Sequence, residues 1–387
     1  MVDFPNRSIF ARLTAGSDAN ALSTRILYVV SNLDRYGAEQ QLALLASRLP
    51  PSEFDVHVCC LDPVGPKDDS PAAGAGVKTV GRRWPLDPLA AVRLERLLHA
   101  LRPDVVHTGC FNSGAYGRLA AMVAGHAHLV AGEPVENHWP AWHRLALGRL
   151  LASKTRAIVV PHAAVRDHFI EHGWPTEKFV VIPPATAPAV ASQLTRGALL
   201  AEIGLPDAVH LIGIVGRLEI EEGWKEVIWT LDILRCVRDD LHLVVVGDGR
   251  QRGQLERFAR LCTLGPNVHF LGRRPDVGQL LPHFNHLWQG GGSGITPAAV
   301  LEALAAGVPV VAADTAGNRE LVIHDQTGFL VPIGDRAGRA RYANRLINDA
   351  GLRARLGAAG RQRMTTQFSV EQMVARHVDL YRRATSG

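Results

Sequence analysis

Short hydrophobic runs alternate along most of the chain with segments whose apolar residues recur at helical spacing. The run at residues 25–31 (RILYVVS) predicts a buried strand, and Leu42, Leu45 and Leu49 follow it at the spacing of one helix face. More elements are expected in the first half, namely strands at 55–61, 76–80, 104–107, 128–131, 157–160 and 180–182 and a helix at 89–101. This alternation predicts a doubly wound α/β unit with a parallel sheet.

The same alternation begins again at residue 210 and predicts a second α/β unit. Its expected elements are strands at 210–215, 242–246, 268–271, 308–312 and 328–331 and helices at 223–237, 251–262, 297–306, 336–348, 352–366 and 370–383. Residues 315–320 (TAGNRE) are predicted to form a glycine-bearing loop. The segment between the two units is rich in Pro, Ala and Thr and predicts a linker.

Composition places the chain among ordinary globular proteins. Its 387 residues are 47% hydrophobic and 20% charged, which suffices for two domains with cores of their own. The formal net charge is only +5, so no nucleic-acid partner is expected. A mildly basic chain suits anionic phosphates or an anionic membrane surface.

Cysteine usage and hydropathy indicate the compartment. The five cysteines form no CxxC pair, so we expect neither a disulfide framework nor a zinc site. No apolar run has the length of a membrane span, and residues 1–23 lack the apolar centre of a signal peptide. A cytoplasmic protein is expected, with peripheral contact at the inner membrane face as a possible addition.

The chemistry-bearing residues gather in the second half. Glu302 stands alone among apolar residues of a predicted helix, and a lone acid in such a place needs a partner or a ligand. Arg217 follows the end of a predicted strand, where a guanidinium suits phosphate oxygens. Ligands of open α/β sheets bind at the carboxyl ends of strands and at helix N-termini, so both residues are candidates for a nucleotide site.

Five strings of the second half appear together, in order: VGRLEIEEGW, VVVGDGRQR, VHFLGR, PAAVLEALAAGVPVVA and TGFLV. In this order and spacing the chain resembles the family 4 glycosyltransferases. The resemblance implies the GT-B fold, in which two Rossmann-like, doubly wound domains face a central cleft. It also implies that a sugar is transferred from a UDP-, GDP- or ADP-sugar to an unknown acceptor, with retention at the anomeric carbon. The reaction of the family uses neither a metal nor another cofactor.

The resemblance also suggests domain boundaries. We expect a flexible N-terminal extension at 1–23, an acceptor domain at 24–190, a linker at 191–206, a donor domain at 207–368 and a C-terminal helix at 369–387. In the family, that helix crosses back to the first domain.

Several donor-binding residues follow from the family motifs. Arg217 matches the residue on the donor diphosphate, and Glu302 matches the carboxylate that accepts hydrogen bonds from the ribose. Ala298 and Ala299 match positions whose backbone N–H groups face the diphosphate at a helix start. Gly37 matches a glycine of the loop that approaches the phosphate from the first domain.

At other motif positions the match to the family pattern is weaker. Gly272 and Arg273 follow a strand at the place where backbone groups hold the base. The first glutamate of the paired motif is replaced by Gly294, and the diphosphate lysine by Glu222. Lys225 lies in the next helical turn, where it either substitutes for that lysine or is a solvated helix residue.

In the first domain, Glu133 or His138 stands where the family often has a histidine. A side-chain base is not obligatory there, because the donor phosphate can take the proton of the attacking acceptor. Because two motif positions differ, one alternative is a non-catalytic relative that binds a nucleotide, a glycan or a protein. A second alternative is a sugar-nucleotide epimerase of the same fold, which depends on fold analogy alone.

Overall fold

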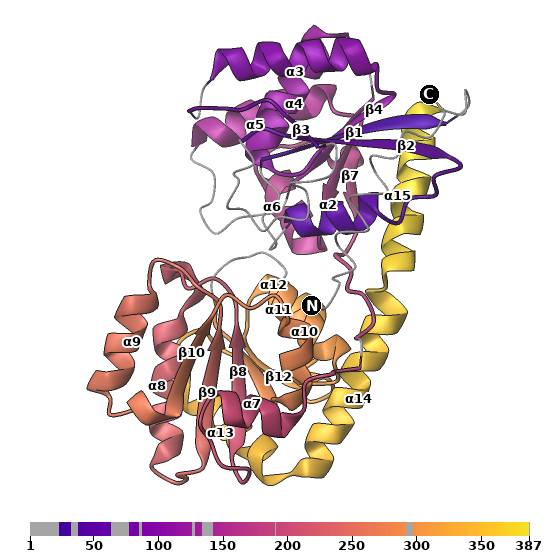
Figure 1. Cartoon of the computed structure of the whole chain (residues 1–387). Helices are drawn as coiled ribbons and strands as arrows, with labels where there is room; N and C mark the ends of the chain where they lie inside the picture. Colours follow the sequence, from indigo (N-terminus) through magenta and orange to yellow (C-terminus); the bar gives the residue numbers. More distant parts are fainter. Residues whose placement is uncertain are drawn as a thin grey trace. The chain divides into compact units, whose positions relative to one another are not determined.

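The computed structural model describes residues 23–31, 38–62, 77–84, 87–125, 128–133, 142–189, 191–291 and 297–386. The chain forms two compact units (Figure 1). One contains the residues up to Pro184 together with those from Val370 onward, and the other contains Ala185–Ser369. Both are α/β units with parallel sheets, as the sequence predicted.

The first unit contains a seven-stranded sheet in the order β3-β2-β1-β4-β5-β6-β7. Its strands are β1 (Thr24–Val30), β2 (Phe54–Cys60), β3 (Lys78–Thr79), β4 (Val105–Thr108), β5 (Leu129–Gly132), β6 (Ala157–Val160) and β7 (Phe179–Val181). The central strand β1 is buried from Ile26 onward and pairs in parallel with β2 and β4. Burial on both faces explains why it reads as one continuous apolar run.

Helices cover both faces of this sheet. They are α2 (Ala38–Ala46), α3 (Pro88–Leu101), α4 (Phe111–Val123), α5 (Trp142–Lys154), α6 (Ala163–Glu171) and α15 (Val370–Thr385), with a 3-10 turn at η2 (Thr176–Lys178). The start of α3 shows why a helix forms there. Asp87 accepts hydrogen bonds from the N–H groups of Leu89 and Ala90, and Pro88 occupies the first turn.

A buried polar cluster attaches α15 to this sheet. The Tyr381 hydroxyl lies 2.7 Å from the Tyr28 hydroxyl and 2.7 Å from Nδ1 of His107. The His377 ring stacks on His107, with ring centroids 5.9 Å apart. His107, at the end of β4, therefore has a structural role in packing the last helix.

The second unit contains a six-stranded sheet in the order β10-β9-β8-β11-β12-β13. Its strands are β8 (His210–Val215), β9 (Leu241–Val246), β10 (Val268–Gly272), β11 (His286–Gln289), β12 (Val310–Ala313) and β13 (Gly328–Val331). Its helices are α7 (Arg196–Glu202), α8 (Trp224–Arg235), α9 (Arg252–Leu261), α10 (Val277–Leu280), α11 (Ala298–Ala305), α12 (Ala316–Leu321), α13 (Arg336–Asn348) and α14 (Ala350–Gln367). Short 3-10 turns lie at η3 (Ile220–Glu222), η4 (Gly265–Asn267) and η5 (Leu281–His283).

The structure differs from the sequence predictions in several elements. The predicted linker contains α7, whose Leu199 and Leu200 are buried in the core of the second unit, so this segment belongs to that unit. The predicted loop at 315–320 contains α12, which Thr315 caps by accepting a hydrogen bond from the N–H of Asn318. The strand β11 and the helices α4, α5 and α6 were not predicted.

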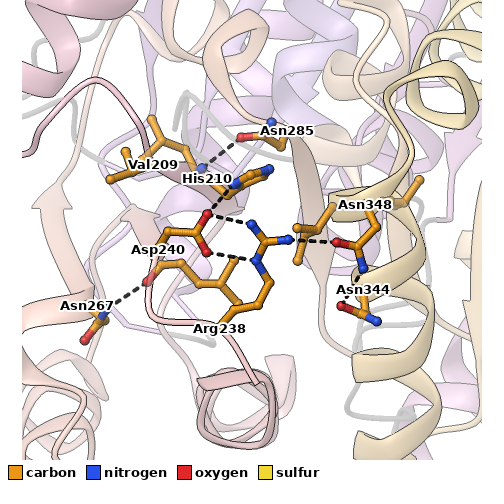
Figure 2. A network of polar contacts seen from close by, with 12 residues as sticks. Val209, His210, Arg238, Asp240, Asn267, Asn285, Asn344 and Asn348 are labelled. Carbon is orange, nitrogen blue, oxygen red and sulfur yellow. Dashed lines mark hydrogen bonds and ion pairs between the residues drawn. The ribbon is translucent and has the colours of Figure 1, made fainter. Parts of the chain in front are cut away.

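A polar network joins strands β8 and β9 to helix α13 (Figure 2). Asp240 accepts hydrogen bonds from Nε and Nη2 of Arg238, at 2.9 and 2.7 Å, and lies 3.0 Å from Nδ1 of His210. Arg238 also donates to the amide oxygen of Asn348 on α13 at 2.7 Å. Because the hydrogen bond from Arg238 favours the carboxylate, the pKa of Asp240 is lowered to about 2. This network lies where β8 and β9 begin, away from their carboxyl ends.

Candidate functional site

The candidate site lies in the second unit, at the carboxyl edge of its sheet. All pairings in this sheet are parallel, so the segments after β8, β9, β10, β11 and β12 leave it at one edge. Arg217 follows β8, Gly272 ends β10, and α11 follows β11 in the chain. The sheet thus brings most of the predicted donor-binding residues to one side of the unit.

Close backbone contacts hold the segments after β8, β9 and β10 together. The N–H of Gly216 donates to the carbonyl of Val246 at 3.0 Å, and the N–H of Gly247 donates to that of Gly272 at 2.8 Å. Gly247 has a φ of +140°, and a Cβ there would lie 1.9 Å from the Gly216 carbonyl oxygen. Only glycine fits this position, so the GDG string fixes how closely the three segments approach.

The end of β11 packs equally closely on η3. A Cβ on Gly290 would lie 1.8 Å from the carbonyl oxygen of Glu222. The start of the glycine-rich stretch therefore lies against the turn that carries the unusual Glu222. Gly294, which the sequence analysis places at the position of the first motif glutamate, lies outside the described residues.

Arg217 presents an exposed guanidinium on a fixed backbone. Its carbonyl oxygen accepts a hydrogen bond from Nε1 of the buried Trp224 at 2.6 Å. Its side chain makes no hydrogen bond or ion pair within the described part of the chain, and the same holds for the exposed side chain of Arg273 after β10. Both cations are therefore available to an anionic ligand.

The first backbone N–H groups of helix α11 have no hydrogen-bond acceptor among the described residues. Pro297 precedes it and provides no side-chain cap. The N–H groups of Ala298 and Ala299 lie in the first turn, which has no intrahelical acceptors. Together with the helix dipole, these amides form a site suited to an anion.

Glu302 lies on the same helix, half-buried between the buried Leu301 and Ala303. Its carboxyl group makes no hydrogen bond or ion pair with any described residue. Burial alone raises its pKa to about 7. A carboxyl group held this way is expected to gain from a ligand that donates hydrogen bonds to it.

Glu222, which the sequence analysis places at the position of the family's diphosphate lysine, is a second half-buried acid of this unit. Burial raises its pKa, the charge of Arg217 opposes that shift, and Glu221 and Glu219 add to it. Its carboxylate is therefore less favourably ionised than a solvated one.

Lys225 is directed to a different neighbour. Its ammonium lies 5.0 Å from the centroid of the Phe258 ring on α9, in a cation–π geometry. This contact supports the interpretation as an exposed helix residue, and a donor contact by Lys225 remains a prediction.

The structure reveals two polar side chains that the sequence analysis did not single out. Oε1 of Gln289, the last residue of β11, and Oδ1 of Asn318 on α12 are buried without a hydrogen-bond partner among the described residues. Gln289 ends β11, and Asn318 follows the carboxyl end of the neighbouring strand β12. A glutamine directly before a run of glycines in an apolar strand was the available sequence signal for the first.

The predicted residues of the first unit have a different environment. Glu133 is buried and accepts a hydrogen bond from Nη2 of the fully buried Arg118 at 2.7 Å. Burial raises the pKa of Glu133, and the charge of Arg118 opposes that shift. This ion pair gives Glu133 a structural partner, and its catalytic role remains a prediction. His138 and Gly37 lie outside the described residues.

The described residues contain neither a cluster of metal ligands nor a membrane-spanning helix. Among them, no three His, Cys, Asp or Glu side chains form a group that could hold a metal ion. No helix that the structure describes is long and apolar enough to cross a membrane.

Comparison with known proteins gives consistent matches over both units. The family model described as "Glycosyl transferases group 1" matches residues 196–363, and the one described as "Glycosyl transferase 4-like domain" matches residues 36–185. The putative glycosyltransferase EpsD of Bacillus subtilis is 26% identical over 78% of this chain and 82% of its own length. An Escherichia coli protein named UDP-Gal:alpha-D-GlcNAc-diphosphoundecaprenol alpha-1,3-galactosyltransferase is 26% identical over 86% of this chain and 90% of its own.

Solved structures agree on the fold. The Anabaena protein Alr3699/HepE in complex with UDP-glucose matches with a TM-score of 0.81 at 21% identity, over 93% of this chain and all of that one. At this identity the match shows the fold alone, which is the predicted GT-B architecture.

Proposed function

Because this chain belongs to the family 4-like glycosyltransferases with the GT-B fold, we propose that it transfers a sugar from a nucleotide diphosphate sugar with retention of anomeric configuration. The acceptor is a glycan, a lipid or a small molecule. The observation that carries this proposal lies on helix α11 of the second unit. The half-buried carboxyl group of Glu302 has no partner among the described residues, and the start of the same helix has no side-chain cap.

Each group of this edge has a proposed role. Glu302 accepts hydrogen bonds from the ribose hydroxyls, and Arg217 neutralises the diphosphate together with the amides of Ala298 and Ala299. Gly272 and Arg273 border the base, whereas a phosphate contact by Gly37, which lies outside the described residues, remains a prediction. Gln289 and Asn318 offer buried oxygens to hydroxyl groups of the donor.

The proposed reaction exchanges one bond at the anomeric carbon. The bond to the diphosphate oxygen breaks, and the acceptor hydroxyl bonds to the carbon on the face that the leaving group occupied. The hydroxyl proton passes to a phosphate oxygen of the donor, so no side-chain base is needed. Arg217 and the start of α11 stabilise the negative charge that builds on the leaving diphosphate.

UDP-sugars are the first donors to test. The Anabaena structures contain UDP or UDP-glucose, and the E. coli relative is named for UDP-galactose. The latter is also named for an acceptor attached to diphosphoundecaprenol. A comparable lipid-linked acceptor would require the protein to reach a membrane surface, and we propose such peripheral contact with an anionic membrane here.

A second candidate function is nucleotide binding without transfer. The specific observation behind it is the carboxylate of Glu222 in place of a diphosphate lysine. In that case nucleotides would bind, and no donor sugar would be released or transferred.

Calorimetry with UDP, GDP and ADP, followed by assays of donor hydrolysis with their sugars, tests the proposal. Arg217→Ala should weaken UDP binding at least about tenfold and leave uridine binding nearly unchanged, because only the diphosphate carries the charge. Arg260→Ala removes an exposed arginine from the last turn of α9 and serves as the matched control. Equal losses with UDP and uridine would contradict the diphosphate contact, and binding of no nucleotide would contradict the proposed function.

A further inference from the structure

Helix α4 of the first unit exposes a purely apolar stripe. Leu119, Met122 and Val123 follow one another at helical spacing and are 45%, 39% and 72% exposed. The opposite side of α4 packs on the sheet through the buried Ala120 and Ala121. Large apolar side chains gathered on one helix face differ from the single exposed residues found on most surfaces.

Neighbouring helices extend this stripe into a surface. α4 packs beside both α3 and α5. Right-handed crossovers along the strand order β1-β4-β5-β6 place these three helices on the same side of the sheet (Figure 1). Leu89 and Val92 on α3 and Leu150 on α5 are likewise exposed, at 58%, 40% and 69%. We call the exposed side of these three helices the α3–α5 face.

The charge on this face has one dominant sign. Neither α4 nor α5 contains an aspartate or a glutamate, and the one acid within α3, Glu95, lies 3.7 Å from Nε2 of His99. Arg149 and Lys154 on α5 and Arg96 on α3 are exposed and form no ion pair with the described residues. The single arginine of α4, Arg118, is buried and paired with Glu133. Apolar side chains with basic neighbours complement an anionic lipid surface, which offers acyl chains beneath negative headgroups.

The second unit provides an instructive contrast. Ile233 and Val237, at the end of α8, are also exposed, at 40% and 69%. Acids lie on the same helix there: Glu226 pairs with Arg336 at 3.0 Å, and Asp232 directly precedes Ile233. An apolar stripe with mixed charge has no preference for an anionic surface.

We propose that the α3–α5 face docks on an anionic lipid membrane. The inference rests on the membrane contact proposed above and assigns that contact to a particular surface of the first unit. A second copy of this chain fits the face less well, since a two-fold interface would bring its basic side chains opposite one another.

Vesicle sedimentation tests this docking surface with a matched pair of variants. The double variant Leu119→Asp/Val123→Asp changes two side chains four residues apart on the α3–α5 face. The control Ile233→Asp/Val237→Asp changes two side chains of the same spacing and similar exposure on the second unit. Full-length protein is mixed with phosphatidylcholine vesicles with and without phosphatidylglycerol, at low and high salt.

The wild type should bind phosphatidylglycerol vesicles, and salt should weaken binding. The first double variant should lose at least about tenfold in partitioning, since it removes apolar area and adds two negative charges. The control should bind as the wild type does. Arg149→Glu/Lys154→Glu should lose the salt-dependent part of binding and leave the apolar stripe intact.

Three results would overturn the docking surface. These are a wild type that ignores phosphatidylglycerol, a double variant that binds normally, and a control that loses as much as the double variant. Light scattering without lipid tests the competing occupant, because a dimer that Leu119→Asp/Val123→Asp dissociates would assign the face to a second copy. Calorimetry with UDP in the same proteins separates this outcome from failure of the proposed function and shows that the variants are folded.

Discussion

At the scale of single residues, Glu302 has the clearest consequence for ligand binding. Its carboxylate can accept two ribose hydroxyls at once, whereas a glutamine offers a neutral oxygen and an amide donor. Glu302→Gln should weaken UDP and uridine binding alike by about 1–3 kcal/mol. Calorimetry with both ligands checks this and distinguishes it from Arg217→Ala, whose effect is confined to UDP. Unchanged affinity for both would remove Glu302 from the site.

The raised pKa of Glu302 adds a dependence on pH. A carboxyl group whose pKa rises from 4.5 to about 7 on folding binds more protons in the folded state between those values. Folding stability therefore falls as pH rises through that window, by an order of 1–3 kcal/mol. Glu302→Gln should abolish this fall, and urea unfolding at several pH values measures it. Parallel pH profiles of the two proteins would contradict the assignment.

Two motif positions should affect binding and turnover differently. Glu222→Lys replaces a half-buried carboxylate near Arg217 with a cation. It should tighten UDP binding by about 1 kcal/mol and affect uridine binding less.

Gly294→Glu restores the family carboxylate and should raise donor hydrolysis or transfer with little change in UDP affinity. Brisk turnover by the unmodified protein would show that another residue fills the Gly294 position.

Sequence alone singled out Arg217 and Glu302 because motif position and chemistry agree there, and their roles in donor binding remain predictions. It could not show that Glu133 is paired with Arg118, because that pair joins residues of different elements. Gln289 and Asn318 were missed for a similar reason. Their significance depends on burial without a partner, which only the folded chain determines.

At the scale of elements, prediction succeeded where local pattern and tertiary burial agree. The long apolar strands β1, β8 and β9 carry their own signal. The strand β11 does not, since its four residues His286–Gln289 include polar side chains and are buried by β8 and β12 on either side. Helix α7 was missed because its proline-rich surroundings suggested a linker, although its leucines fill the core of the second unit.

The network around Asp240 predicts how the starts of β8 and β9 respond to acid. Folding lowers the pKa of Asp240 from 3.8 to about 2. The stabilisation that its carboxylate gives the folded state is therefore fully present above pH 3.8 and is lost as the pH falls toward 2. Asp240→Asn should destabilise the second unit by about 1–2 kcal/mol at neutral pH, a figure reduced because the side chain is partly exposed to solvent. Urea unfolding at neutral and acidic pH checks this, and the difference from the wild type should shrink in acid. Arg238→Gln should behave similarly, since it removes the same hydrogen bonds.

At the scale of the whole molecule, the chain leaves the first unit near Pro184 and returns to it at Val370. The first unit is therefore completed only when the last residues are present. Helix α15 packs on the sheet of this unit. The Tyr381 hydroxyl connects the helix to β1 and β4 through its contacts with the Tyr28 hydroxyl and with Nδ1 of His107. The proposed donor-binding residues that the structure describes all lie in the other unit, so the two units should respond separately to mutation.

This division predicts which transition Tyr381 controls. Tyr381→Phe leaves the Tyr28 hydroxyl and Nδ1 of His107 without their shared partner, which should cost about 1–3 kcal/mol. Tyr381→Ala also leaves a cavity and should cost about 3–5 kcal/mol. Urea unfolding with and without UDP identifies the transition of the second unit as the one that the ligand shifts. Both variants should lower the other transition and leave UDP affinity unchanged, whereas an equal shift of the UDP-sensitive transition would mean that the two units unfold as one.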